Sequence, residues 1–182
     1  MKIGLDEQNS YRHPVGFKLF FLTVIALLFV SVMGCFYPDD KKYLDDLSRL
    51  KQKYGVSTTF SVNLVNMNDY IAEASVLAGS ATPPVKKIIE VEVYSAQAFY
   101  HLSKALDDSS NIPYPINNCN SRIFKSTLSN AILSKNYSAK AISLISSLFE
   151  EDLKYLREGQ LEAVKDYESK AGELISVLKE KC

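Results

Sequence analysis

The stretch from Pro84 to Leu106, PVKKIIEVEVYSAQAFYHLSKAL, decides the fold class of this chain. Apolar and small residues recur along it at the spacing of one helix face: Ile88, Val91, Ser95, Ala98, Leu102 and Ala105. Proline suits the first turn of a helix, because the missing N–H would have no partner there. The stretch therefore predicts one long helix, which we expect to stop at the polar run Asp107 to Ser110.

Helical spacing of apolar residues predicts further helices on both sides of this stretch. A short helix follows Pro38 and ends before Gly55, which supplies a left-handed stop. A second helix is expected from about Thr59 to Ala78, although Val56 to Leu64 also alternates as a strand would. Later periodic segments run from about Ser121 to Ser134, from about Ile142 to Leu156 and from Leu161 to Leu178, with a pause at Asn136-Tyr137-Ser138 and a break at Gly159.

The whole pattern indicates an all-α fold, an up-and-down bundle of five or six helices that follows an N-terminal transmembrane or signal segment. Seven glycines and six prolines are few for an all-β chain rich in turns. Short connections at Gly79 to Pro83 and at Gly159 favour antiparallel neighbours. The small residues expected to let helices approach closely are Ala72, Ala74, Ala96, Ala98, Ala139, Ser143 and Ser146.

The segment from Leu19 to Tyr37 is apolar along nearly its whole length and carries no charged side chain. About 20 apolar residues in a helix cross the ~30 Å hydrocarbon core of a bilayer. Basic residues precede the segment, as they precede both signal peptides and anchors. We therefore divide the chain into a cytoplasmic leader at 1–18, a membrane anchor or lipoprotein signal segment at 19–37, and an extracytoplasmic helical domain at 38–182.

The apolar segment contains the tetrapeptide Val32-Met33-Gly34-Cys35 near its end. This tetrapeptide resembles the lipobox of bacterial lipoproteins, in which an aliphatic residue, a small residue and Gly or Ala precede the cysteine that receives the lipid. The resemblance implies that Cys35 becomes the lipidated first residue of the mature protein. An uncleaved single-pass anchor is the alternative. Both interpretations place the bulk of the chain outside the cytoplasm, in the periplasm or at the cell surface.

The charge balance bears on which partners the chain can have. Lys plus Arg number 21 and Asp plus Glu also number 21, so there is no basic excess of the kind that binding to nucleic-acid phosphates requires. We therefore expect no nucleic-acid partner. The expected partners are the membrane, through residues 19–37 or a lipid on Cys35, and another envelope protein.

Residues typical of catalysis or metal binding are sparse. His101 is the sole histidine after the apolar segment, and Ala98 stands where a Glu-x-x-His metal motif would need glutamate. No Cys-x-x-Cys pair or phosphate-binding loop occurs. We expect no metal, no cofactor and no enzymatic activity, unless His101 reaches one of the carboxylates Glu90, Glu92 or Asp107 in a cleft. Glu90 and Glu92 themselves are expected to be ordinary solvated charges.

The sequence NIPYPINNCN at 111–120 must form a loop, because no regular element tolerates so many prolines and asparagines. Within it, Pro113 and Pro115 hold Tyr114 in an extended segment that has little chain entropy to lose on binding. Ten of the eleven tyrosines follow Phe36, mostly for packing at helix boundaries. Pro113, Tyr114 and Pro115 are our candidate partner contact.

Cys119 and Cys182 are candidates for a disulfide, since an exported domain lies in an oxidising compartment. The expected helices raise an objection to this bond. Three alternating helices after Cys119 would put Cys182 at the opposite end of the bundle, about 30 Å away, whereas a disulfide needs Cα atoms within about 7 Å. The bond and a simple meander are therefore incompatible, unless Ser121 to Ser134 lies across the bundle or the loop Asn117 to Asn120 runs along it.

These features predict a membrane-tethered, extracytoplasmic, non-enzymatic helical module that contacts or scaffolds another envelope protein. The alternative function is a ligand-binding or sensory domain with a pocket between helices. A cavity with convergent polar groups would favour the second function, and a solid bundle the first.

Overall fold

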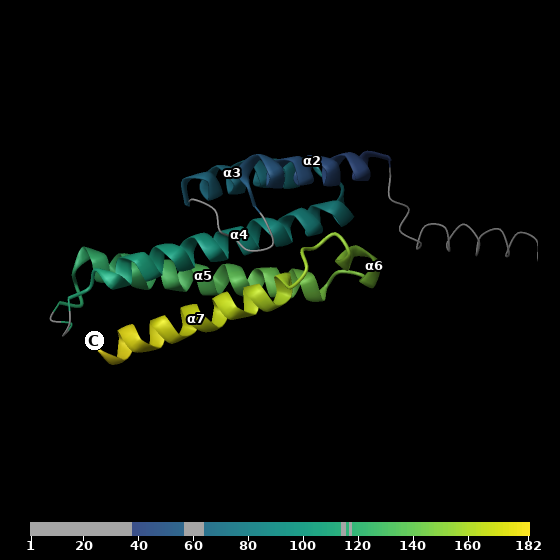
Figure 1. Cartoon of the computed structure of the whole chain (residues 1–182). Coiled ribbons are helices and arrows are strands. Elements are labelled where there is room, and N and C mark those ends of the chain that lie inside the picture. The colour runs from purple at the N-terminus through teal and green to yellow at the C-terminus, as the bar shows by residue number, and fades with distance from the viewer. Residues whose placement is uncertain (1–37, 57–63, 114–115, 117) are drawn as a thin grey trace, which may run out of the picture. The chain divides into compact units, whose positions relative to one another are not determined.

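The central element of the fold in the computed structural model is α4, Pro83–Ser110, the longest helix among the described residues (Figure 1). The model describes residues 38–56, 64–113, 116 and 118–182, all within the compact unit Pro38–Cys182. The leader at 1–18 and the segment at 19–37, including Cys35, lie outside the described residues. Among the described residues, no helix is both long and apolar enough to cross a membrane.

α4 ends at Ser110, the last residue of the polar run where the stop was expected, so that prediction is confirmed. Polar groups of this run satisfy backbone carbonyls of the last turn. The hydroxyls of Ser109 and Ser110 each donate to a backbone carbonyl one turn earlier. The backbone N–H of Asn111, which caps the helix, donates to the carbonyl of Asp108 at 3.1 Å.

α5, Arg122–Ser146, is a single helix of 25 residues, and the predicted pause at Asn136-Tyr137-Ser138 is wrong. Ser121 caps its start by accepting a hydrogen bond from the backbone N–H of Phe124 at 3.2 Å, as the resumption at Ser121 predicted. Asn, Tyr and Ser have only slightly lower helix propensity than good helix formers, so tertiary packing can keep this segment helical. Ser138 is fully buried, and Tyr137 packs between two side chains of α4.

The predicted helix from Ile142 to Leu156 is also wrong, because α5 ends at Ser146 and a separate short helix follows. The hydroxyl of Ser147 donates to the carbonyl of Leu144 at 2.8 Å and terminates α5. The chain then forms α6, Glu150–Leu153, and turns at Gly159 before α7, Gln160–Glu180. Gly159 has φ 70°, a left-handed conformation that glycine adopts without a steric penalty, so the predicted break there is confirmed.

Two helices precede α4 in the described unit. α2, Pro38–Tyr54, ends at Gly55 with φ 66°, as predicted. α3, Leu64–Ser80, supports the helical interpretation over the strand from Leu64 onward, while residues 57–63 lie outside the described part. The helix continues through Gly79, where we expected it to end, and only two residues then separate it from α4.

α4, α5 and α7 form an antiparallel three-helix bundle, and the α2–α3 hairpin covers the N-terminal half of α4 (Figure 1). Most residues at the hairpin's contact with α4 are large and apolar; they are Leu47, Met67, Tyr70, Val85, Ile89 and Val93, with Ala74 among them. The interface of α4 with α5 is made of smaller residues. For example, the buried hydroxyl of Ser134 donates directly to the backbone carbonyl of Ala98 at 2.8 Å.

The predicted all-helical architecture is confirmed for the described residues, with six helices in this part of the chain. Small residues do lie buried between neighbouring helices, but only some of them are the ones that we expected. Ala74, Ala96 and Ala98 are buried as predicted. Ala72, Ala139, Ser143 and Ser146 are exposed instead. On α5 the buried small positions are Thr127, Ala131, Ser134, Ser138 and Ala141.

Candidate functional site

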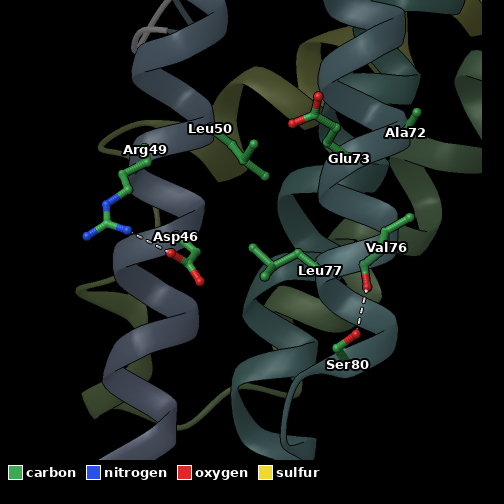
Figure 2. Close-up of a pocket in the computed structure, with 8 residues that line it drawn as sticks. All are labelled: Asp46, Arg49, Leu50, Ala72, Glu73, Val76, Leu77 and Ser80. Carbon is green, nitrogen blue, oxygen red and sulfur yellow. Dashed lines mark hydrogen bonds and ion pairs between the residues drawn. The ribbon is translucent and has the colours of Figure 1, made fainter.

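An open groove lies between α2 and α3, with a volume of about 610 Å³ (Figure 2). Leu50 of α2 and Leu77 of α3 point toward each other across it. Both are half-buried, because their inner sides pack against the core while their outer sides line the groove. Val76, with 72% of its surface exposed, extends the apolar lining on the α3 side.

The polar groups along the groove already have partners. The guanidinium of Arg49 donates to the carboxylate of Asp46 at 3.2 Å on α2. The hydroxyl of Ser80 donates to the backbone carbonyl of Val76 at 3.3 Å on α3 (Figure 2). These groups border an apolar floor and do not converge on its centre.

Glu73 closes the groove at the end where α2 finishes. Its carboxylate accepts from the ammonium of Lys53 at 2.7 Å and from the hydroxyl of Tyr54 at 2.6 Å. The hydrogen bonds from Lys53 and then Tyr54 lower the pKa of the Glu73 carboxyl, and the same carboxylate raises the pKa of the Lys53 ammonium. This three-residue cluster joins α2 to α3 across the gap.

A second, largely buried cluster around Glu92 holds α2 against the bundle. Glu92 of α4 is completely buried. Its carboxylate accepts from the ammonium of Lys51 at 2.6 Å, and the guanidinium of Arg157 lies 3.1 Å from its second oxygen. A buried carboxylate requires such compensation by charge and hydrogen bonds. Because Lys51 belongs to α2 and Arg157 to the α6–α7 connection, Glu92 connects three separate parts of the chain.

The Glu92 cluster continues into α7. The side-chain oxygen of Gln160 accepts from the backbone N–H of Arg157 at 3.0 Å, and its nitrogen donates to the hydroxyl of Ser95 at 3.0 Å. Gln160 and Ser95 are both buried. The start of α7 is therefore fixed to α4 one turn beyond Glu92.

Tyr70 of α3 is fully buried close to this cluster. Burial raises the pKa of its phenol well above the ordinary value, the negative charge of Glu92 adds to the increase, and the positive charge of Arg157 opposes it. Its hydroxyl has no hydrogen-bond partner among the described residues. The phenol therefore stays neutral at all ordinary pH values.

The expectation that Glu92 is a solvated charge is wrong, while Glu90 is partly exposed and near Lys86 at 3.9 Å. A signal for Glu92 existed in the sequence. Glu92 follows Ile88 by four residues and precedes Ala96 by four, so it occupies the same helix face as buried apolar positions. A charged residue that interrupts such a face is either paired or functional.

His101 of α4 contacts α5. Its Nδ1 donates to the amide oxygen of Asn130 at 2.9 Å, and its ring stacks on Tyr137 with centroids 5.6 Å apart. A catalytic role for His101 was expected only if it reached the carboxylate of Glu90, Glu92 or Asp107. The structure gives His101 an amide partner in place of these carboxylates. Across residues 38–56, 64–113 and 118–182, no cluster of three or more potential metal ligands occurs.

The sequence matches no protein-family model, and it has no significant match among curated proteins or among solved structures.

Cys119 and Cys182 are joined by a disulfide, with Cα atoms 5.9 Å apart. The objection from helix count fails because α5 is continuous. Only two long helices, α5 and α7, follow Cys119, so the chain returns to the end at which it started (Figure 1). The bond and the meander therefore coexist.

The proposed partner contact at Pro113, Tyr114 and Pro115 is only partly described. Pro113 is exposed in the loop between α4 and α5, and Tyr114 and Pro115 lie outside the described residues. The lipidation candidate Cys35 also lies outside them. The groove between α2 and α3 was not among the sequence-based candidates, because its residues are ordinary members of two amphipathic helices.

Proposed function

We propose that this protein is a membrane-tethered, non-enzymatic helical module that binds a helix of another envelope protein in the groove between α2 and α3. The observation that carries the proposal is the apolar lining of the groove, formed by the half-buried Leu50 and Leu77 and the exposed Val76. Apolar side chains that line a common groove and remain open to water are typical of binding surfaces. An amphipathic helix that buries its apolar face in such a groove would remove these side chains from water.

The arrangement of polar groups favours a protein partner over a small ligand. The groove volume of about 610 Å³ would accommodate a small molecule. However, small-molecule sites have polar groups that converge on the ligand and fix its orientation. Here Asp46, Glu73 and Ser80 hydrogen-bond within α2 and α3, at the borders of the groove. This pattern suits a polar rim around an apolar interface core.

The proposed location at a membrane, outside the cytoplasm, rests mainly on the sequence. The uncharged segment from Leu19 to Tyr37 has the length of a membrane anchor, and the lipobox-like tetrapeptide ending at Cys35 offers a lipid anchor instead. The Cys119–Cys182 disulfide supports an extracytoplasmic location, because structural disulfides persist in oxidising compartments. The ligand-binding or sensory domain is the second candidate, supported by the volume of the same groove.

A pair of matched substitutions tests the proposal. Val76 and Val65 are on the same helix, with 72% and 69% of their surfaces exposed, and only Val76 lines the groove. We would purify the tagged full chain from its own membranes, carrying V76E or V65E, and compare the co-purified proteins by mass spectrometry. A groove partner is expected to remain with V65E and to be lost with V76E.

Two outcomes would contradict the proposal. Equal recovery of all co-purified proteins with both variants would exclude the groove as the contact. A small molecule in the native mass spectrum of the purified protein, lost in V76E, would support the ligand-binding alternative. Unchanged helical circular dichroism in both variants serves as the folding control.

A further inference from the structure

We propose that the end of the bundle that carries Phe149 lies on the surface of the lipid bilayer, with the Phe149 ring in the interfacial region. This inference rests on the membrane tether in the proposed function and adds a second, direct contact with lipid. The surface concerned is separate from the groove between α2 and α3: it is the exposed apolar surface at the bundle end that carries Phe149.

Phe149 is the most exposed large apolar side chain of the described residues, at 74%. It lies in the turn between α5 and α6. Together with Leu148, Pro83 and Pro84 it lines a shallow depression of about 200 Å³ at the end of the bundle. Leu153 of α6 is also exposed, at 41%. The exposed Phe149, Pro83 and Pro84 therefore lie together where α4 begins and α5 ends.

The position of this surface relative to the start of the domain suggests what covers it. The hydroxyl of Thr82, directly before α4, donates to the carboxylate of Asp40 in the first turn of α2. The first residue of the described unit, Pro38, is therefore at the same end of the bundle as Pro83, Pro84 and Phe149. The chain emerges from the domain beside the apolar depression.

The chain preceding this point is short. Cys35 and the end of the apolar segment are three residues or fewer before Pro38. An extended chain spans at most about 3.5 Å per residue, so a membrane attachment at Cys35 lies within about 10 Å of Pro38. The tether of the proposed function would therefore keep the bundle end beside Pro38 close to the lipid surface.

The chemistry of the surface fits a lipid interface. Phe and Leu side chains of segments that lie on a bilayer are buried at the boundary between headgroups and acyl chains. The exposed charges nearby are of both signs, with more cations than anions: Lys41, Lys42, Lys86, Lys87 and Lys154 against Glu150 and Glu151. These cations do not oppose a lipid surface, and vesicles of zwitterionic phosphatidylcholine test the contact of the ring without the added attraction of anionic lipid.

The absence of tryptophan from the chain permits a sharp test. F149W places a single indole at the proposed contact, and V177W places a single indole on α7 near the other end of the bundle, where Val177 is 46% exposed. Each full-length variant would be reconstituted in phosphatidylcholine vesicles with and without brominated phosphatidylcholine, which quenches indole emission on contact. We expect a blue-shifted emission maximum and strong quenching for F149W, and neither for V177W.

The possible outcomes distinguish the contact of Phe149 with lipid from the membrane tether of the proposed function. If the chain floats with the vesicles but F149W is no more quenched than V177W, the bilayer contact is wrong and the tether stands. If neither variant floats with vesicles, the tether fails and the contact fails with it. If V177W is quenched as strongly as F149W, lipid contact is not specific to the Phe149 end and the inference is overturned.

Discussion

Lys51 and Glu92, 41 positions apart in sequence, form the hydrogen-bonded ion pair that fixes α2 to the bundle at 2.6 Å. Leu50, the residue before Lys51, lines the groove between α2 and α3. The position of the groove wall therefore depends on a carboxylate buried in a different helix. This dependence links domain stability to the shape of the proposed binding surface.

Glu92→Ala should lower the free energy of unfolding by about 3–5 kcal/mol, because it leaves Lys51 and Arg157 without their buried counter-charge. Chemical denaturation followed by circular dichroism would measure the loss. Glu90→Ala is the matched control, two residues away on the same helix and partly exposed, and should change stability by less than about 1 kcal/mol. Similar effects of the two substitutions would show that the Glu92 cluster contributes no special stability.

Tyr70→Phe should raise the free energy of unfolding by about 1 kcal/mol at neutral pH, because it removes a buried hydroxyl that has no hydrogen-bond partner among the described residues. Tyr54→Phe is the control, since that hydroxyl donates to Glu73 at 2.6 Å, and it should be neutral or destabilising. The measurement is urea denaturation of both variants. A clear loss of stability in Tyr70→Phe would mean that the hydroxyl is satisfied in solution.

The same variant has a predicted pH dependence. Burial raises the folded-state pKa of Tyr70, so the neutral phenol contributes stability that is fully present below the unfolded pKa of about 10 and is lost as pH rises through the folded value. The wild-type protein should therefore lose stability above about pH 10 faster than Tyr70→Phe. Parallel slopes of the two proteins in that range would contradict the assignment.

The disulfide between Cys119 and Cys182 closes a loop of 63 residues. In the chain-entropy account, such a cross-link stabilises a protein by about 4 kcal/mol. Cys119→Ser with Cys182→Ser should lower the free energy of unfolding by roughly this amount, measured by denaturation without reductant. Reduction of the wild-type protein should have a similar effect, and the double variant should not respond to reductant. Two free thiols in exported wild-type protein would exclude the bond.

Tyr114→Ala should lower the free energy of unfolding by less than about 1 kcal/mol, as surface substitutions usually do. The prediction comes from the two prolines around Tyr114 and remains to be tested, since Tyr114 lies outside the described residues. Thermal denaturation of the variant would measure it. A loss of several kcal/mol would identify Tyr114 as a core residue and remove it as a partner contact.

Cys35→Ala should abolish lipid labelling and leave an unprocessed precursor, if the tetrapeptide Val32 to Cys35 acts as a lipobox. Metabolic labelling with a fatty-acid analogue and intact-mass measurement would check both effects. Mature wild-type protein that still carries Met1 to Gly34 would support the uncleaved anchor instead.

Periodicity of apolar residues predicted the helices of this domain well where a helix has one apolar face and a glycine after it. It failed where polar residues take part in packing. Asn136-Tyr137-Ser138 looks like a break in the sequence, yet α5 runs through it, with Ser138 buried and Tyr137 packed against α4. Local pattern cannot reveal such compensation, because the partner atoms come from another helix.

The same limit applies to the candidate site. Glu92 interrupts an apolar helix face, and this pattern in the sequence indicated a buried charge. Its partners could not be predicted, because Lys51 and Arg157 are 41 and 65 positions away in the sequence. The groove between α2 and α3 arises from the angle at which two ordinary amphipathic helices pack. No residue within it is unusual for its helix, so no pattern in the sequence marks it.

The disulfide encloses α5, α6 and α7 in a covalent ring and leaves α2, α3 and α4 outside it. Tension applied between Pro38 and Cys182 would pass along α2, α3 and α4 to Cys119 and then directly across the sulfur bridge to Cys182. The three helices inside the ring would carry none of it. A pull between these two residues would therefore extend only the N-terminal half of the described unit, starting at the Asp40–Thr82 hydrogen bond, and the ring would limit how far this unit can be drawn out.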